Sequence, residues 1–558
     1  MPASGVGVHA GVGEAISAVG GGVGAAQEAN RINTKNVTGS LSRMSVPLES
    51  VLHESLGNSS ICLANRVAYL DAVQLRQELI LDALTLLSAS LPFTIPRMDI
   101  ESQYNKALDY LYSFVDYSLK HSSELAKAEF NLDRMFALME ELGDPQNKYP
   151  IIHVAGTKGK GSVSALCASG LKVAGYKVGL YTSPHLLDFC ERIQVNGEPI
   201  SREFLVELVE EIKPAVAKIP KLTTFEITTA LGFLAFAKQG CNAAVIEVGL
   251  GGRLDATNIV TPKVSVITSL SYDHMAVLGD TLAKIAGEKA GIIKRGVPVV
   301  SSPQKDEALE VLERVARLED SSFTLVGKDI NTGTRTFSPP NERTKVRVPE
   351  FESIASSLDG QSLRLIDNLR PATLDLQLPL LGHHQLENAA TAYAALKVSG
   401  LDVSDEAIQN GFAQVKWRAR FEIARRDPPV IFDSAHNEDS FLKLRETLET
   451  YFPNKQAYLI FGASEDKNIP GMFAALKPKI QRLIVTRADH PRALEEEKIV
   501  ELARQAEIES EAVSPVESAL ARALELSAKD GSIVLSAGSM FVTAEVMKAW
   551  MEITKAAD

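Results

Sequence analysis

Short apolar runs alternate with longer amphipathic segments over most of this chain, beginning near residue 100. Five strand-like runs occur between residues 151 and 303, and each is followed by a helical pattern: IIHVAG, VGLYTS, AAVIEVGLGG, VSVITSLSYDH and VPVVSSP. The spacing of apolar residues also predicts helices over 104–119 and 131–142. Strands that alternate with helices in this way predict a largely parallel sheet with helices packed on it.

The same alternation resumes near residue 415, with the runs PPVIFDSAHN, AYLIFGA, RLIVTRAD and SIVLSAGS and a helical pattern over 441–451. Between the two series, residues 305–372 mix charge, proline and short apolar runs, which predicts a surface elaboration or a small antiparallel sheet. The stretch LDLQLPLLGHHQLENAATAYAAL then predicts a strand running into a helix. We therefore expect two α/β domains, residues 96–412 and 413–558, with a hinge near 405–420. A cleft between two domains is the first place to look for an active site.

Residues 1–95 have a different texture. The first fifty are rich in Gly, Ala, Ser and Val, carry only three acidic residues and have sparse Arg and Lys. Such composition is typical of an organelle transit peptide. We expect a mitochondrial address first and a plastid second; a disordered extension of a cytoplasmic protein is the alternative. An apolar helical pattern within residues 61–92 belongs to neither expected domain.

Composition excludes several classes of protein. Among the 558 residues, 45% are hydrophobic and 23% charged, which is ordinary for a globular protein. The net charge of −12 argues against a non-specific nucleic-acid binder. The chain also has no run of eighteen apolar residues, the length needed to span a membrane. The four cysteines lack metal-ligand spacing and form no dense framework. Buried thiols in a reducing compartment are therefore expected.

The segment GTKGKGS, residues 156–162, lies between an expected strand and an expected helix. A glycine-rich turn in that position exposes backbone N–H groups that bind phosphate. Lys160 adds a mobile cation, and Ser162 can ligate the Mg²⁺ that accompanies a nucleotide. The usual phosphate-loop pattern is incomplete, because Val154 stands where it has glycine and Gly161 separates the lysine from the serine. A flexible loop is the alternative, but the strand before and the helix after favour a nucleotide site.

Three more polar clusters, TSPH, EVGLGG and SYDH, follow predicted strands and should meet the glycine loop at one edge of the sheet. Within them, Ser183, Glu247 and His274 offer ligands for a hard divalent cation. Lys289 stands at a predicted helix end, where a solvated lysine is the alternative. Asn388 either bonds a nucleotide base or caps a helix.

The chain resembles the folylpolyglutamate synthase and dihydrofolate synthase family of Mur-ligase-type amide ligases in nine motifs that occur in this order: HVAGTKGKGS, YTSPHL, FEITTALGF, EVGLGGRLDATN, SYDH, EKAGI, GHHQLENAATA, WRARFE and DSAHN. The resemblance runs from about residue 100 to the C-terminus and is closest to plant-type dihydrofolate synthases. It implies an α/β fold, with a parallel-sheet, P-loop ATPase-like N-terminal catalytic domain and a smaller Rossmann-like C-terminal domain. It also implies a monomer that uses ATP and Mg²⁺ to join L-glutamate to dihydropteroate through an acyl phosphate, with no protein nucleophile.

The resemblance also assigns roles to residues of this chain. The predicted ATP contacts are Gly156, Thr157, Lys158, Gly159, Lys160, Gly161, Ser162, Asn388, Arg420 and Asp433. The predicted magnesium ligands are Ser183, Glu247 and His274, and Lys289 matches a lysine that becomes carbamylated. The predicted substrate contacts are Phe225, Glu226, Ile227, Thr228, Leu254, Asp255, Ala256 and His436. Lys160, His274 and Lys289 are the predicted catalytic residues.

Two departures from the family pattern bear on function. Residues 417–420 read WRAR where the family has WPGR, and Glu438 follows Asn437 where the family has proline. They raise the alternative of a regulatory protein that binds nucleotide but has lost ligase activity. The lysine of the glycine loop, the predicted metal ligands and Lys289 are all retained, which argues against this alternative. Ala155 and the run GLGGRLDATN look more like members that accept dihydropteroate. Extension of a folate glutamate tail, alone or as a second activity, is the other alternative.

Overall fold

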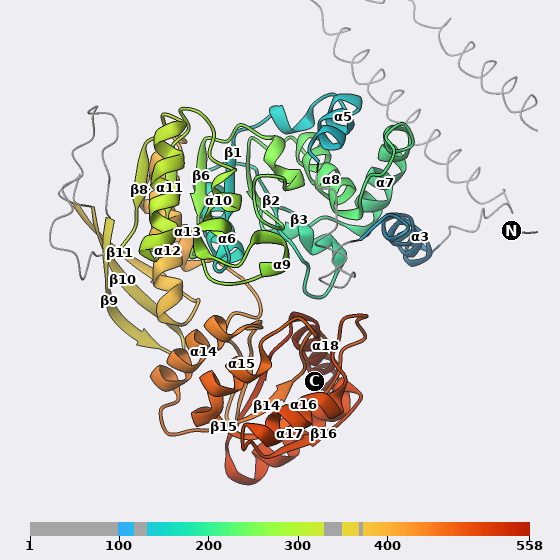
Figure 1. Cartoon of the computed structure of the whole chain (residues 1–558), viewed down its shortest axis with the longest axis vertical. Helices are drawn as coiled ribbons and strands as arrows, with labels where there is room; N and C mark the ends of the chain where they lie inside the picture. The colour runs from blue at the N-terminus through green and yellow to red at the C-terminus, as the bar shows by residue number, and fades with distance from the viewer. Residues whose placement is uncertain (1–98, 117–130, 328–348, 368–371, 558) are drawn as a thin grey trace, which may run out of the picture. The chain divides into compact units, whose positions relative to one another are not determined.

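The computed structural model describes residues 99–116, 131–327, 349–367 and 372–557 (Figure 1). The predictions made for residues 1–95, and Cys62 with them, lie outside the described residues. The other three cysteines, Cys167, Cys190 and Cys241, are buried free thiols, as expected. The described chain builds two α/β bodies, each around its own sheet (Figure 1).

An eight-stranded sheet in the order β4-β3-β2-β5-β1-β6-β7-β8 forms the centre of the first domain. The strands from β2 to β8 in this order run parallel, while β3 and β4 form an antiparallel edge. Every residue of β1, β2, β5, β6 and β7 is buried, which explains why these strands appear in the sequence as continuous apolar runs. The strands are β1 (Ile151–Ala155), β2 (Val178–Tyr181), β3 (Ile193–Val195), β4 (Glu198–Pro199), β5 (Ala243–Glu247), β6 (Val264–Ile267), β7 (Val299–Ser301) and β8 (Phe323–Leu325).

Helices cover both faces of this sheet. Alternate residues of β1 enter different cores: Ile152 and Val154 pack with one set of helices and Ile151 with the other. The first set is α6 (Lys160–Val173), α12 (His383–Val398) and α13 (Asp405–Ala413). The second set is α3 (Ile100–Tyr112), α5 (Asp133–Glu141), α7 (Arg202–Val216) and α8 (Thr224–Lys238). Near β6, β7 and β8 lie α10 (Leu282–Ala290) and α11 (Asp306–Leu318).

Two sequence-based expectations need correction. The helix predicted over 104–119 begins earlier, at Ile100 with Asp99 as its N-cap, and ends at Tyr112. The region 305–372 contains the predicted antiparallel sheet, with β11 (Ala372–Leu378), β10 (Gly360–Asp367) and β9 (Pro349–Ser357) in that order, but it begins with the helix α11. The buried residues of α11 are Ala308, Val311, Leu312 and Ala316, at helical spacing. The dense charge between them obscured this amphipathic pattern in the sequence.

The second domain has a six-stranded sheet in the order β12-β13-β17-β14-β15-β16. All its strands run parallel except β12, which pairs antiparallel with β13 at one edge. The strands are β12 (Glu422–Arg426), β13 (Pro429–Phe432), β14 (Ala457–Phe461), β15 (Ile480–Val485), β16 (Ser510–Ala512) and β17 (Ile533–Ala537). One core contains α14 (Glu438–Tyr451), α15 (Ile469–Leu476) and α16 (Glu496–Gln505), and the other contains α17 (Val516–Asp530) and α18 (Met540–Ala557).

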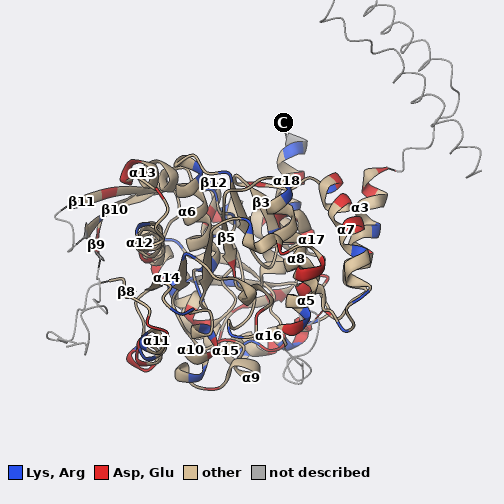
Figure 2. Cartoon of the chain, turned by 90° about the horizontal axis from the view of Figure 1, so that it is seen from above, with Lys and Arg blue, Asp and Glu red and all other residues tan. Residues whose placement is uncertain are grey.

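Acidic and basic residues are interspersed along the described helices (Figure 2). None of the helices in the described ranges has the length and hydropathy needed to cross a bilayer.

Candidate active site

The glycine loop joins β1 to α6, as the sequence predicted. Gly156 and Gly159 both have positive φ values, +152° and +89°. A Cβ atom on Gly156 would lie 1.8 Å from the Thr268 hydroxyl oxygen, and one on Gly159 would lie 2.3 Å from the Asn388 side-chain oxygen. Both positions therefore require glycine, on steric grounds as well as for backbone conformation.

The loop is fixed from one side and open on the other. The backbone N–H groups of Thr157 and Lys158 both donate to the Ser269 carbonyl, at 3.0 Å each. No side chain caps the N-terminus of α6, whose first residues line a cavity. Uncapped N–H groups at a helix N-terminus, together with the helix dipole, suit a phosphate.

The cavity has a volume of about 790 Å³ and is lined by both domains. The structure thus brings together residues that the sequence had distributed over several strand ends. The predicted site residues on its wall are Gly156, Thr157, Lys158, Gly159, Lys160, Gly161, Ser162, Ser183, Phe225, Glu226, Thr228, Glu247, Leu254, Asp255, Ala256, His274, Lys289, Asn388, Arg420, Asp433 and His436.

Glu247, at the end of β5, is one of the buried carboxylates of this wall. It is 6% exposed, and burial raises its pKa while Lys160 opposes the rise. The Lys160 Nζ lies 3.9 Å from Glu247 Oε1, and the Ser183 backbone N–H donates to Oε2 at 3.4 Å. A carboxylate held this close to the phosphate loop suits a hard cation.

The predicted magnesium ligands surround the cavity without forming a preassembled cluster. The His274 side chain is 37% exposed, and its partial burial at the cavity wall lowers its pKa to about 4, which favours the neutral imidazole, the form that ligates a metal. In the part of the chain that the structure describes, only Glu495, Glu496 and Glu497 form a group of three carboxylate, imidazole or thiol ligands within 4.8 Å of one another. Glu247 and His274 would therefore need the Ser183 hydroxyl and phosphate oxygens to complete a shell, as Mg²⁺ commonly does. The magnesium assignment stays a prediction.

Lys289 is not a solvated lysine; that alternative is wrong. It lies in the last turn of α10, is 4% exposed, and its Nζ donates to the Gly156 carbonyl at 2.9 Å. Burial lowers its pKa to about 7, with Lys160 adding to the effect. A lysine with a pKa near neutral pH has a substantial uncharged fraction that can react as an amine, which is compatible with the predicted carbamylation.

Asn388 lies in the second turn of α12 and does not cap it, so the capping alternative is also wrong. Its Nδ2 donates to the Gln385 side-chain oxygen at 2.9 Å, and its own oxygen faces Gly159. The indole of Trp417 packs against Gly161, where a Cβ atom would lie 2.9 Å from the ring. The interdomain linker therefore contacts the phosphate loop directly.

The structure explains the first departure from the family pattern. Ala419, where the family has glycine, has a φ of +52°, and Arg420 follows it into the cavity. Alanine in the left-handed region costs about 1–2 kcal/mol more than glycine, so the departure strains the backbone, while Arg420 still lines the cavity. Asp433 holds this turn, because its carboxylate accepts from the backbone N–H groups of Phe421 and Ala435, each at 2.8 Å.

The second departure is also accommodated. Glu438 is the first residue of α14 after the N-cap Asn437, where both proline and an acidic residue are favoured. Its Oε2 accepts from the Asn468 side chain at 2.9 Å. Neither departure removes a group from the cavity wall.

The predicted substrate segment at the start of α8 divides into wall and core. Phe225 lines the cavity and packs against Gly249, where a Cβ atom would lie 2.4 Å from its ring. Glu226 also forms a capping box with Thr223 and an ion pair with Arg134 at 3.0 Å. Ile227 is fully buried in the core of the first domain and does not line the cavity.

Asp273, beside His274, was not identified from the sequence. Its carboxylate accepts from Lys158 Nζ at 3.2 Å, and from Lys467 Nζ at 3.2 Å and Asn437 Nδ2 at 3.3 Å in the second domain. The Nε2 atom of His436 lies 3.9 Å away. Burial alone would raise the pKa of Asp273, but Lys158 and the other surrounding cations hold it well below its usual range. Its partners lie as many as 194 residues away along the chain, so spacing gave no signal.

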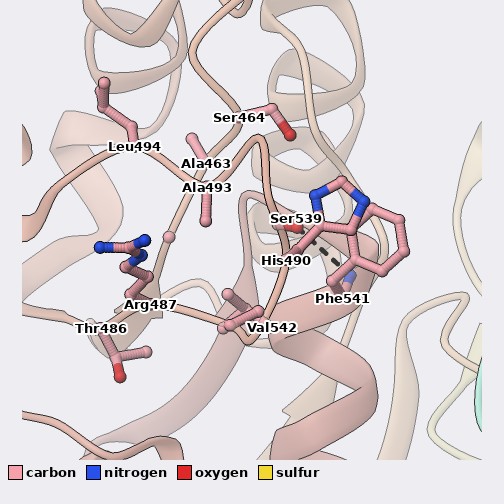
Figure 3. Close-up of a pocket in the computed structure, with 12 residues that line it drawn as sticks. Ala463, Ser464, Thr486, Arg487, His490, Ala493, Leu494, Ser539, Phe541 and Val542 are labelled. Carbon is pink, nitrogen blue, oxygen red and sulfur yellow. Dashed lines mark hydrogen bonds between the residues drawn. The ribbon is translucent and has the colours of Figure 1, made fainter. Parts of the chain in front are cut away.

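A smaller hollow in the second domain lies next to the cavity (Figure 3). The ring of His490 stacks on Phe541, with centroids 4.0 Å apart and planes 20° apart. The Nδ1 atom of His490 accepts from the Arg492 backbone N–H at 3.2 Å, and the Phe541 backbone N–H donates to the Ser539 hydroxyl at 3.2 Å. His490, Ser539 and Phe541 also line the large cavity, so the two spaces share a wall. None of these residues was singled out from the sequence.

Comparison with known proteins now identifies the family. Residues 154–396 match the Mur ligase middle domain, and residues 419–540 match the Mur ligase glutamate ligase domain. The dihydrofolate synthase/folylpolyglutamate synthase of Bacillus subtilis is 36% identical over 429 residues, which cover 75% of this chain and 94% of that protein. The chain belongs to the dihydrofolate synthase/folylpolyglutamate synthase family. The α/β fold class predicted for this chain is confirmed.

Solved structures of the dihydrofolate synthase/folylpolyglutamate synthase family share the fold. The folylpolyglutamate synthase of Mycobacterium tuberculosis, solved with ADP and AMPPCP, superposes with a TM-score of 0.70 at 31% identity, covering 81% of this chain and 99% of that one. The Escherichia coli FolC protein, solved with DHPP and ADP, gives a TM-score of 0.68 at 29% identity, covering 81% of this chain and 98% of that one.

Proposed function

We propose that this protein uses ATP to join L-glutamate to the carboxyl group of dihydropteroate, forming dihydrofolate, ADP and phosphate. The observation that carries the proposal is the cluster of Lys160, Glu247 and Lys289 around an open phosphate loop, in a cavity to which a second domain contributes Arg420 and Asp433. The nucleotide complexes of two relatives support the assignment of ATP.

The chemistry requires the carboxylate to be activated. A carboxylate is a poor acylating agent, so one of its oxygens first takes the γ-phosphoryl group of ATP, and ADP leaves. The phosphate loop holds the phosphates through its N–H groups, and Lys160 offsets charge on the transferred group. The buried carboxylate of Glu247, with Ser183 and His274, would hold Mg²⁺, which when bound neutralises phosphate charge.

The second step forms the amide. The neutral α-amine of glutamate attacks the carbonyl carbon of the acyl phosphate, a C–N bond forms, and phosphate leaves as the nitrogen loses a proton. Lys158 and His436 lie on the same wall, with their nitrogen atoms 3.4 Å apart, and Lys158 places a cation near the developing charge. Both domains must face the cavity for this step, so domain closure belongs to the cycle.

The choice of dihydropteroate rests on sequence features of the wall. Ala155, fully buried at the end of β1, and the run 249–258, which follows β5, resemble in sequence the members of the family that accept dihydropteroate. Extension of a folate glutamate tail is the second candidate, since the relative in Bacillus subtilis is named for both activities. A protein with both activities would use the same activation chemistry.

One comparison of substrates tests the proposal. Purified protein is given ATP, Mg²⁺ and L-glutamate with dihydropteroate, or with tetrahydrofolate, and ADP release and product mass are measured. We expect turnover with dihydropteroate, and none with the Lys160→Ala variant, which serves as the control for contaminating ligase. Turnover with tetrahydrofolate alone contradicts the preference for dihydropteroate. Titration that shows ATP binding without ADP release under any condition supports the regulatory alternative.

We further propose that residues 1–95 carry an organelle address, with mitochondria as the first expectation. Among the described residues, those that line the cavity begin at Tyr112. A chain that begins at Met98 should therefore keep its ligase activity. A fluorescent protein fused to residues 1–95 should enter an organelle, and a diffuse signal throughout the cytosol contradicts the targeting proposal.

A further inference from the structure

His153 is a polar residue in the middle of the apolar strand β1. It is 0% exposed and pairs in register with Ile246 of β5 on one side and Ser265 of β6 on the other. A buried imidazole costs free energy unless it is hydrogen-bonded. Its hydrogen-bond partners therefore indicate why it is there.

A chain of hydrogen bonds runs from His153 to the cavity wall. The Nε2 atom of His153 lies 2.9 Å from the hydroxyl oxygen of Thr257, which is also fully buried. The Thr257 hydroxyl contacts Asp255 Oδ1, which also accepts from the Thr257 backbone N–H at 3.0 Å. The other oxygen, Oδ2, accepts from the Leu250 backbone N–H at 2.9 Å. Three side chains thus connect the centre of the sheet to the glycine-rich run 249–254.

The chemistry of these groups fixes the direction of each hydrogen bond. Burial raises the pKa of Asp255, and the hydrogen bonds that it accepts oppose this rise. Both of its oxygens accept from a backbone N–H group, the arrangement of a carboxylate, which has no proton to donate. The Thr257 hydroxyl must therefore donate to Asp255 and accept from His153. His153 then carries its proton on Nε2, and its Nδ1 is an acceptor.

The electrostatic surroundings agree with a neutral ring. Burial lowers the pKa of His153 to about 3, and the positive charge of Lys294 adds to the effect. Among the described residues, no donor lies within hydrogen-bond distance of the buried Nδ1 atom. A buried nitrogen without a hydrogen bond destabilises the folded protein. The Nδ1 atom of His153 is in this state, and the ring makes one hydrogen bond, from Nε2 to Thr257. That hydrogen bond is the contribution by which His153 differs from an apolar residue.

The glycine-rich run that receives this chain forms part of the cavity wall. Leu250, Gly251 and Leu254 line the cavity, and Gly249 packs on the ring of Phe225. The opposite side of the run is held by the Arg253 backbone N–H, which donates to the Glu288 carbonyl at 2.8 Å. Asp255 is therefore the anchor between the run and the sheet.

We infer that His153 is a positioning residue for the pterin-bearing substrate, acting through Thr257 and Asp255 on the glycine-rich wall 249–254. The inference rests on the proposed function, since the aromatic and aliphatic surface of Phe225 and Leu254 suits a flat ring. The phosphate loop forms a different part of the wall. The effect of His153 is thus confined to the KM for the pterin substrate and spares the KM for ATP.

Two substitutions at position 153 distinguish the loss of the hydrogen-bond donor from a change in side-chain volume. His153→Leu fills the site but cannot donate, and it should raise the KM for dihydropteroate about fivefold, the loss of one neutral hydrogen bond, with kcat and the KM for ATP little changed. His153→Gln keeps an N–H group at the place of Nε2 and should restore the KM. The matched control is Ser265→Ala, which removes a buried hydroxyl whose hydrogen bond runs to the Ile292 carbonyl, and it should leave both KM values unchanged.

A second site tests whether the effect is relayed. Thr257→Val should raise the KM for dihydropteroate by itself, and adding His153→Leu to it should cause little further change. Losses that multiply, or a KM for ATP that rises equally, would overturn the inference. If His153→Leu does not fold, Thr257→Val and His153→Gln still decide the question.

A measurement without substrate keeps this inference distinct from the proposed function. Heteronuclear NMR of histidine-labelled protein should show one neutral imidazole protonated at Nε2 that is absent from His153→Gln; protonation at Nδ1 overturns the inference. Wild-type protein that forms no product from dihydropteroate contradicts the proposed function instead. Wild-type turnover with an unchanged KM in His153→Leu contradicts the inference alone.

Discussion

The contact between Asp273 and Lys467 should control closure of the two domains. The Lys467 Nζ lies 3.2 Å from Asp273 Oδ1, and the two side chains are 12% and 10% exposed. The perturbation is Lys467→Met, which keeps the length of the side chain and removes its charge. Lys467 belongs to the second domain and Asp273 to the first, so the contact exists only when they face each other.

The magnitude follows from the distance and the burial. At 3.2 Å, the attraction between unit charges is about 5 kcal/mol at an effective dielectric constant of about 20. Breaking a buried pair from one side costs about 3–5 kcal/mol. Lys158 remains beside Asp273 in the variant, so we take the lower value, about 3 kcal/mol. If this free energy is lost from the closed arrangement of the two domains, kcat/KM drops roughly 100-fold.

The assay is a double-mutant cycle on kcat/KM with Lys467→Met, Asp273→Asn and the double variant. We expect the double variant to be much better than the product of the single losses, because the second substitution removes a charge that the first left unpaired. Thermal unfolding of each domain should shift little. Lys529→Met, at an exposed pair with Glu525 on α17, is the control and should change kcat/KM less than twofold. Single losses that simply multiply would refute the reasoning.

Three further predictions concern the cavity. If Glu247 and His274 ligate Mg²⁺ as predicted, Glu247→Ala and His274→Ala should each abolish most turnover and leave the fold intact. Near-normal kcat at saturating Mg²⁺ in either variant removes that residue from the site. Burial lowers the pKa of Lys289 from the ordinary 10.5 to about 7 in the folded protein, so the unfolded chain binds more protons between these two pH values. The unfolding free energy should therefore rise with pH over this range, by at most about 5 kcal/mol. Denaturant titrations of Lys289→Met should lack this rise, and an unchanged slope means that the lysine is charged in the native state. Gly159→Ala should abolish ATP binding, because its Cβ would lie 2.3 Å from a side-chain oxygen, whereas Gly175→Ala, with a similar φ but open space, should only lower stability, by about 1 kcal/mol; equal calorimetric titrations of ATP for both would contradict the steric argument.

The sequence predicted the elements whose signal is local. The buried strands β1, β2 and β5 are continuous apolar runs, and the glycine loop follows β1 directly, so both could be placed without a structure. Glu247 ends β5, whereas His274 lies beyond the end of β6, at the N-cap of α9 (Met275–Leu278), and not in the strand as predicted. Both follow strands of one parallel sheet, which was sufficient to predict that they share an edge. The charged surface of α11 concealed its four buried positions, and that helix was missed.

What the sequence did not reveal depends on contacts between distant segments. Asp273 stands in the SYDH motif, next to a residue that was identified, but its role depends on Lys467 and Asn437 across the domain boundary. His153 has the same limitation, because its partner Thr257 lies 104 residues further along the chain. Ile227 was predicted as a substrate contact together with its neighbours in 225–228. Adjacent residues of a helix point to different sides, and the Ile227 side chain is in the core.

The packing of Trp417 against the phosphate loop gives the protein an intrinsic optical probe. The chain has two tryptophans, and the other, Trp550, lies in the second domain against Phe432. In a Trp550→Phe variant, all indole emission would come from a ring in contact with Gly161, at the start of α6. Binding of a nucleotide at the loop should then alter the intensity or wavelength of that emission. Occupancy of the loop could thus be followed in real time by stopped-flow fluorescence without a label, before any bond is made.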